Sequence, residues 1–148
     1  MRKRGAKPKP NIVLDTSAYA RFREGNEEVA EWLAVADTVA LPMMVLGELE
    51  AGFVLGSRTE ENRVTLDDFL AEPFVQVLAV SRETATRYGA LFAALRRKGT
   101  PVGTNDIWIA AAAIDSARHL LTFDGDFDHI PGLDVTVLEA PASPRRRR

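Results

Sequence analysis

The chain has 148 residues, 46% of them hydrophobic and 27% charged, a composition typical of one globular domain with a substantial core. It contains no cysteine, which excludes disulfides, thiolate zinc sites and cysteine nucleophiles. No run of about 18 apolar residues exists, and the basic start lacks the apolar segment of a secretion signal. We therefore expect no membrane span and a cytoplasmic protein.

The formal net charge of −2 conceals an uneven distribution along the chain. Five basic residues precede Asn11 and four arginines end the chain, whereas all 21 acidic residues lie between these two segments. We expect residues 1–10 and 141–148 to be disordered basic tails that flank a single domain over 11–140. The acidic middle favours carboxylates gathered around a metal ion over a basic groove for nucleic acid.

Strand and helix signals alternate along the chain from Asn11 to Leu138. Helix caps are expected at Asn26 and Ser81, and Pro42 is expected as a first helical residue. The pattern predicts strands at 11–14, 38–41, 74–80, 119–122 and 135–138. It predicts helices at 17–23, 26–36, 42–55, 59–71, 81–98 and 104–117. Because no hairpin signal interrupts this alternation, we expect an α/β fold around a mostly parallel sheet.

Three acidic residues lie where the chain leaves a predicted strand or enters a helix. Asp15 ends the first strand, Asp124 follows the strand 119–122, and Asp106 lies in the first turn of a buried helix. In an open parallel sheet these positions converge on one crevice. Each also has an ordinary structural interpretation, as a helix cap for Asp15, a helix-dipole partner for Asp106 and a turn residue for Asp124.

A fourth acid, Glu48, interrupts an apolar face of the helix predicted at 42–55. Burial of an isolated carboxylate is costly unless a partner or a metal ion offsets it. Glu50 in the same helix also has apolar neighbours, and the periodicity does not choose between the two.

Four converging carboxylates would favour a specific chemistry. They would raise one another's pKa values unless cations lay between them, and hard oxygen ligands suit Mg²⁺ or Mn²⁺. Such ions can activate a water for in-line attack on phosphate. The hydroxyls of Thr16, Ser17 and Thr104 could hold ligands or waters in place. No glycine-rich phosphate loop is present, and the two histidines do not support a serine–histidine triad.

Four segments together resemble the PIN-domain ribonucleases, specifically the VapC-type toxins of toxin–antitoxin pairs. The segments are IVLDTSA at 12–18, VLGELEAG at 45–52, GTNDIWIAAAA at 103–113 and LLTFDGDFDHIPGL at 120–133. The resemblance implies a three-layer α/β/α sandwich with a mostly parallel five-stranded sheet. It also implies a metal-dependent endoribonuclease that a small antitoxin neutralises.

The resemblance also implies the site residues, the metal and the partners. Its acidic quartet corresponds to Asp15, Glu48, Asp106 and Asp124, with Asp126 as a possible supplement. The family pattern E-L-x-x-G fits VLGELEAG only with Glu48 as the metal-binding acid.

We expect Mg²⁺ or Mn²⁺ as the cofactor, RNA as the substrate and a homodimer as the assembly. We expect the antitoxin on the N-terminal helices, where the candidate contacts are Tyr19, Phe22, Trp32 and Leu33, each of which could equally be a core residue. Substrate contacts are expected from scattered arginines, namely Arg21, Arg23, Arg58, Arg63, Arg96 and Arg97, or from the basic tails. The run Arg96-Arg97-Lys98 is explained first by the dipole at the C-terminus of its helix, with RNA contact as the alternative.

Two alternatives have no nuclease activity. One is a PIN-like domain that only binds a partner. The other is a receiver-like Mg²⁺-binding signalling module, which would also gather acids at strand ends. A receiver would want a second acid beside Asp15, where Thr16 and Ser17 stand instead.

Overall fold

The computed structural model describes residues 8–140 and contains one sheet of five parallel strands in the spatial order β3-β2-β1-β4-β5. The strands are β1 (Asn11–Leu14), β2 (Thr38–Pro42), β3 (Val75–Leu78), β4 (His119–Thr122) and β5 (Val135–Val137). The predicted parallel sheet is confirmed, although β3 is shorter than the predicted 74–80. A receiver-like module is wrong, because doubly wound sheets of that type have the order 2-1-3-4-5.

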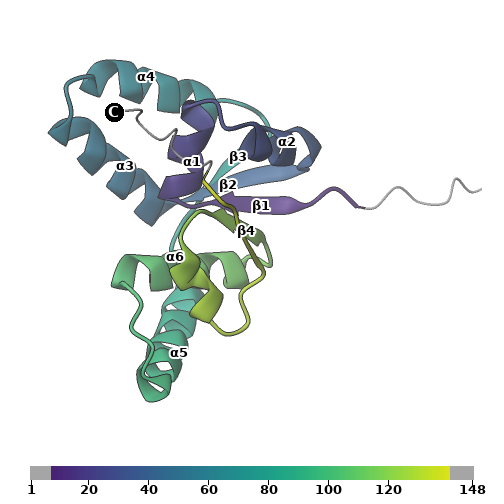
Figure 1. The fold of residues 1–148 in the computed structure, drawn as a ribbon, viewed down its shortest axis with the longest axis vertical. Helices are drawn as coiled ribbons and strands as arrows, with labels where there is room; N and C mark the ends of the chain where they lie inside the picture. The colour runs from purple at the N-terminus through teal and green to yellow at the C-terminus, as the bar shows by residue number, and fades with distance from the viewer. Residues whose placement is uncertain (1–7, 141–148) are drawn as a thin grey trace, which may run out of the picture.

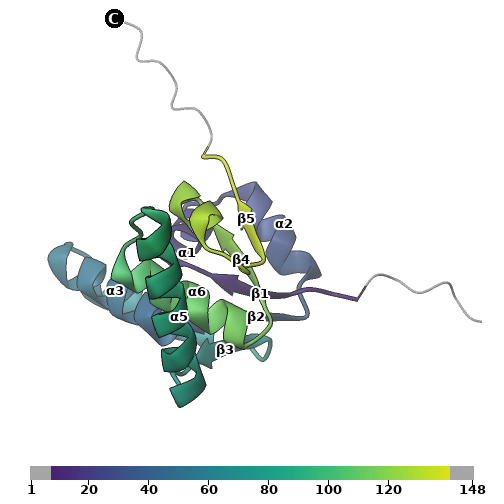
Figure 2. The ribbon, with the colours of Figure 1, turned by 90° about the horizontal axis from the view of Figure 1, so that it is seen from below.

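Helices cover both faces of the sheet (Figures 1 and 2). They are α1 (Thr16–Arg23), α2 (Glu27–Val35), α3 (Met43–Leu55), α4 (Thr59–Leu70), α5 (Arg82–Lys98) and α6 (Thr104–Asp115), with a 3₁₀ helix η1 (Gly125–His129). In Figure 1, α5 and α6 lie below the sheet, whereas α1, α2 and α4 lie above it. Helix α3 contacts α1, α4 and α6. The predicted three-layer sandwich is therefore confirmed.

Side-chain caps begin three of the six α-helices of the described chain, namely α1, α2 and α5. The Asn26 side chain accepts a hydrogen bond from the Val29 amide at 3.0 Å, and Ser81 forms a capping box with Thr84. Pro42 differs from expectation. It is the last residue of β2, with an extended ψ of 149°, and it lies opposite Leu78 in the sheet register. A proline is compatible with either place, because its fixed φ occurs in both helix and extended chain.

The central strands are buried on both faces, as in other parallel sheets covered by helices. Ile12, Val13 and Leu14 of β1 have no exposed surface, and neither do Leu120 and Leu121 of β4. No helix within residues 8–140 is both long and apolar enough to cross a bilayer. Except for residues 8–10, the predicted basic tails lie outside the described residues.

Candidate metal centre

Asp15 follows β1 directly and is the N-cap of α1. Its Oδ1 accepts hydrogen bonds from the Ala18 amide at 2.8 Å and from the Ser17 hydroxyl at 2.7 Å. Its Oδ2 accepts a 2.5 Å hydrogen bond from the Thr122 hydroxyl. The residue is only 4% exposed. Asp15 therefore does cap the helix, and the same contacts fix a buried carboxylate at the carboxyl end of the central strand.

Two hydroxyls connect Asp15 to the segment that follows β4. Thr122 Oγ1 accepts a hydrogen bond from the Asp124 amide at 3.0 Å while it donates to Asp15. Ser17 Oγ accepts from the Phe123 amide at 3.0 Å while it donates to Asp15. Ser17 therefore contacts the Asp15 carboxylate, and its role toward a metal ion stays a prediction. Thr122 was missed from the sequence, although a threonine that ends an apolar strand just before a candidate acid is a usable signal.

The two glutamates of α3 have different surroundings. Glu48 Oε1 accepts a hydrogen bond from the Thr16 hydroxyl at 2.9 Å, which brings it to the first turn of α1. Glu50 instead accepts a 2.6 Å hydrogen bond from Arg63 Nε of α4. The ion pair with Arg63 accounts for the carboxylate of Glu50, whereas Glu48 lies toward the other acids.

Among the four predicted acids, which we call the acidic cluster, Asp106 has the most strongly raised pKa. Its pKa is raised to about 6, first by partial burial and then by repulsion from the carboxylates of Asp124, Glu48, Asp15 and Asp126, in decreasing order. Because such repulsion weakens with distance, Asp106 lies within electrostatic range of each of the other predicted acids. Thr104 is exposed, and its side chain makes no hydrogen bond within the described residues, so no contact supports its expected role.

Asp124 is closer to the centre of the cluster than Asp126. It repels Asp106 more strongly, and of the two only Asp124 raises the pKa of Asp15, where burial is the largest cause. Asp124 is also the N-cap of η1 and accepts a 2.9 Å hydrogen bond from the Asp126 amide. Asp126 is exposed and lies at the margin of the cluster.

No cationic side chain of residues 8–140 compensates these carboxylates. In the part of the chain that the structure describes, Asp15, Glu48, Asp106 and Asp124 form no ion pair with Lys, Arg or His. Within the same residues, no group of three or more Asp, Glu or His side chains is arranged to hold a metal ion as it stands. The oxygen donors and the unmet demand for positive charge fit a hard divalent cation.

Comparison with known proteins agrees with this arrangement. The chain matches the PIN domain family over residues 12–133. It is 35% identical over 104 residues to ribonuclease VapC2 of Rickettsia felis, an alignment that covers 70% of this chain and 76% of that protein.

Two solved structures are similar over most of the chain. VapBC2 from Rickettsia felis, bound to a DNA fragment from its promoter, has a TM-score of 0.78 at 27% identity. The aligned region covers 85% of this chain and 97% of the R. felis chain. VapBC-5 from Mycobacterium tuberculosis, a member of the VapBC family of toxin–antitoxin systems, has a TM-score of 0.66 at 27% identity and covers 88% and 99%. By its sequence and its fold, this chain belongs to the PIN domain family, within the VapC group.

Proposed function

We propose that this protein is a VapC-type endoribonuclease toxin that hydrolyses RNA phosphodiester bonds and is neutralised by a cognate antitoxin. The observation that carries the proposal is the meeting of four carboxylates from four separate segments, with no cationic partner among the described residues. The ribonuclease name of the similar R. felis protein supports the same activity. We place the activity in the cytoplasm, where cellular RNA is found.

Ribonucleases of this family generally depend on a divalent metal ion. Here Asp15 and Asp106 would hold the principal ion, which we take to be Mg²⁺ or Mn²⁺, and Glu48 and Asp124 would complete its surroundings. When bound, the ion supplies a Lewis acid that activates water and offsets the charge of the phosphate. Asp126, which is exposed at the margin of the four acids, would assist them in binding the ion.

The residues of the chain prepare this site in different ways. Ser17, Thr122 and the Ala18 amide hold the Asp15 carboxylate in one orientation, so little reorganisation is needed when a cation binds. Burial and repulsion from the neighbouring acids raise the pKa of Asp106, and a bound cation would relieve that repulsion. The same acids repel RNA phosphates, so the contacts that hold RNA must come from basic residues outside the cluster. No nucleophilic side chain is required.

The antitoxin surface is proposed to lie on α1, α2 and α4. A groove of about 400 Å³ there is lined mainly by Phe22, Arg23, Leu33, Phe69 and Phe74. The Arg23 guanidinium lies 5.0–5.2 Å from the ring centres of Phe22, Phe69 and Tyr19.

Of the four predicted antitoxin contacts, Phe22 and Leu33 line this groove and Tyr19 lines an adjoining one. Trp32 lines neither, and instead stacks on His119 with 5.2 Å between ring centres. The homodimer remains a prediction.

The test of the activity is cleavage of a structured RNA by purified protein free of antitoxin. We expect cleavage with Mg²⁺ or Mn²⁺, no cleavage in EDTA, and a loss of at least a hundredfold for Asp106→Asn. Glu50→Gln is the matched control, because Glu50 pairs with Arg63 outside the cluster. Cleavage that persists in EDTA, or that Asp106→Asn leaves unchanged, would contradict the proposal. A stable protein that binds its antitoxin but cuts no RNA would favour the binding-only alternative.

A further inference from the structure

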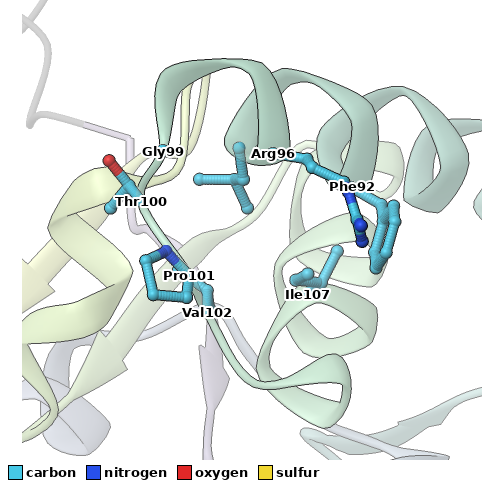
Figure 3. Close-up of a pocket in the computed structure, with 8 residues that line it drawn as sticks. Phe92, Arg96, Gly99, Thr100, Pro101, Val102 and Ile107 are labelled. Carbon is cyan, nitrogen blue, oxygen red and sulfur yellow. The ribbon is translucent and has the colours of Figure 1, made fainter.

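Another concave feature lies where α5 turns into α6. This α5–α6 pocket has a volume of about 300 Å³ (Figure 3). Its lining residues are Phe92, Leu95, Arg96, Gly99, Thr100, Pro101, Val102 and Ile107. Figure 3 shows Phe92 and Arg96 projecting from α5 toward Ile107 of α6. The pocket lies at the small end of ligand sites, which run from about 300 to 1,000 Å³, and so suits a single flat group.

The α5–α6 pocket shares the first turn of α6 with the candidate metal centre. Ile107, which lines the pocket, follows Asp106 directly in that turn. Gly103, the N-cap of α6, comes after the lining residue Val102, and a Cβ built on Gly103 would lie 3.8 Å from Asp106 Oδ2. A polymer bound across the carboxylates would therefore pass close to the pocket.

The lining combines three kinds of surface. The floor is apolar, because it is formed by the side chains of Leu95 and Ile107, which are each 2% exposed. Phe92 is 38% exposed and offers part of an aromatic ring to a ligand. Arg96 adds a cation, and the exposed Arg97 and Lys98 follow it. None of these three cations forms an ion pair within residues 8–140.

This combination is what an unstacked nucleobase requires. Proteins recognise single-stranded RNA by stacking its bases on aromatic rings and arginine planes, with nearby cations on the phosphates. A purely apolar partner would gain nothing from the Arg96 cation in the lining, which forms no ion pair within residues 8–140. The charge of the rim thus favours a nucleotide over an apolar side chain of a second copy.

We infer that the α5–α6 pocket binds one unpaired base of the RNA substrate, close to the bond that is cut. Phe92 stacks on the base, Leu95 and Ile107 form the floor, and Arg96 contacts the sugar–phosphate or the base edge. The inference rests on the proposed ribonuclease function and adds to it a residue set that selects which nucleotide lies beside the scissile bond. Arg97 lies next to Arg96 in sequence but does not line the pocket.

The test measures binding without metal and without cleavage. The four ribonucleoside 5′-monophosphates are titrated into the full protein in EDTA while the methyl signals of Val102 and Ile107 are followed by NMR. At least one nucleotide should shift both signals in a saturable way. Phe92→Leu should raise its Kd about tenfold, as expected for the loss of a stacking ring, whereas Phe92→Trp should keep binding.

The matched pair of charge variants separates local contact from general attraction. Arg96→Gln should weaken binding several-fold, and Arg97→Gln should change it less than twofold. Equal effects of the two variants, or no shift with any nucleotide, would overturn the inference. So would methyl shifts that follow dilution of the protein alone, because a second copy would then fill the pocket.

Cleavage of RNA by the same preparation separates the inference from the function on which it rests. A protein that cleaves RNA with Mg²⁺ but binds no nucleotide at Ile107 would overturn the inference alone. A protein that binds nucleotides at this pocket but cleaves no RNA would contradict the proposed function while supporting a nucleotide site.

Discussion

The Thr122 hydroxyl donates a 2.5 Å hydrogen bond to the buried Asp15 carboxylate, and so joins the ends of β4 and β1. The two residues are 107 positions apart in the chain. They meet because β1 and β4 are neighbours in register, with Leu14 opposite Leu121. The same hydroxyl accepts a hydrogen bond from the Asp124 amide. Thr122 thus links two of the four acids and is fully buried.

Removal of this hydroxyl should destabilise the protein and weaken the metal centre. Thr122→Val keeps the shape of the side chain but leaves a buried carboxylate without one donor, at a cost of about 1–3 kcal/mol. Urea unfolding in EDTA measures this loss, and Mn²⁺ titration measures the affinity. Thr122→Ser keeps the donor and should lose less. Equal stability of the valine and serine variants would show that the hydrogen bond contributes little.

The metal-free protein should lose stability as pH rises through about 4 to 6. The pKa of Asp106 is raised from 3.8 to about 6, so the folded state holds this proton more tightly than the unfolded state does. The stabilising difference is present while the group is protonated in the folded protein, and it disappears once pH passes about 6. Because Asp106 is only half-buried, solvent screening reduces the effect to roughly 1 kcal/mol, or about 2–4 °C in Tm.

Thermal melting in EDTA at pH 5 and pH 7 measures this dependence. From pH 5 to pH 7 the Tm of the wild type should decrease relative to the Tm of Asp106→Asn, because the asparagine does not titrate. A constant difference between the two proteins at both pH values would contradict the raised pKa.

The antitoxin groove can be tested by substituting a half-buried leucine that lines it and an exposed valine on the same helix. Leu33→Asp places a charge in the groove and should weaken antitoxin binding by about 2 kcal/mol, roughly 30-fold. Val35→Asp makes the same kind of change on α2 at a residue that is 55% exposed and lines no groove described here. Calorimetry with the cognate antitoxin compares the two variants. Equal affinities would place the antitoxin elsewhere.

Ala117 has a left-handed backbone, with φ of 54°, directly after the α6 C-cap Ser116. The amides of Ala117 and Arg118 bond to the carbonyls of Ile114 and Ala113, the pattern of a Schellman motif, where glycine is preferred. Ala117→Gly should therefore raise the free energy of unfolding by up to about 1 kcal/mol.

The same substitution in a right-handed helix is the control for this effect. Ala90→Gly in the middle of α5 should lower stability by about 1 kcal/mol. Urea midpoints of the two variants should move in opposite directions. A loss of stability in both would show that the strain at Ala117 is negligible.

Much of the fold was predictable because its signals are local. Asn26 and Ser81 cap helices through residues only three positions away, and Gly99 ends α5 with a left-handed backbone, so each boundary can be read from a few letters. The convergence of Asp15 and Asp124 followed from topology, since the carboxyl ends of parallel strands meet at one edge.

The remaining features depend on contacts that are distant in sequence. The local sequence marks Thr122 as the end of an apolar strand before an acid, but its contact with Asp15 depends on the pairing of β1 with β4. Periodicity gives Glu48 and Glu50 similar apolar neighbours, so the choice of Glu48 came from the resemblance to the PIN-domain family. In the structure the two differ because α4 places Arg63 against Glu50. The pocket at Phe92 forms only when α5 packs on α6.

The most direct test of the metal centre is the rise of Tm with Mn²⁺ at neutral pH in three proteins: the wild type, Glu48→Gln and Glu50→Gln. A ligand at 100 times its Kd stabilises by about 2.7 kcal/mol, so the wild type should melt roughly 5–10 °C higher. Glu50→Gln should show the same rise from its own starting value, and Glu48→Gln should lose most of it. No rise in the wild type, or an equal rise in Glu48→Gln, would contradict a divalent metal held by the four carboxylates.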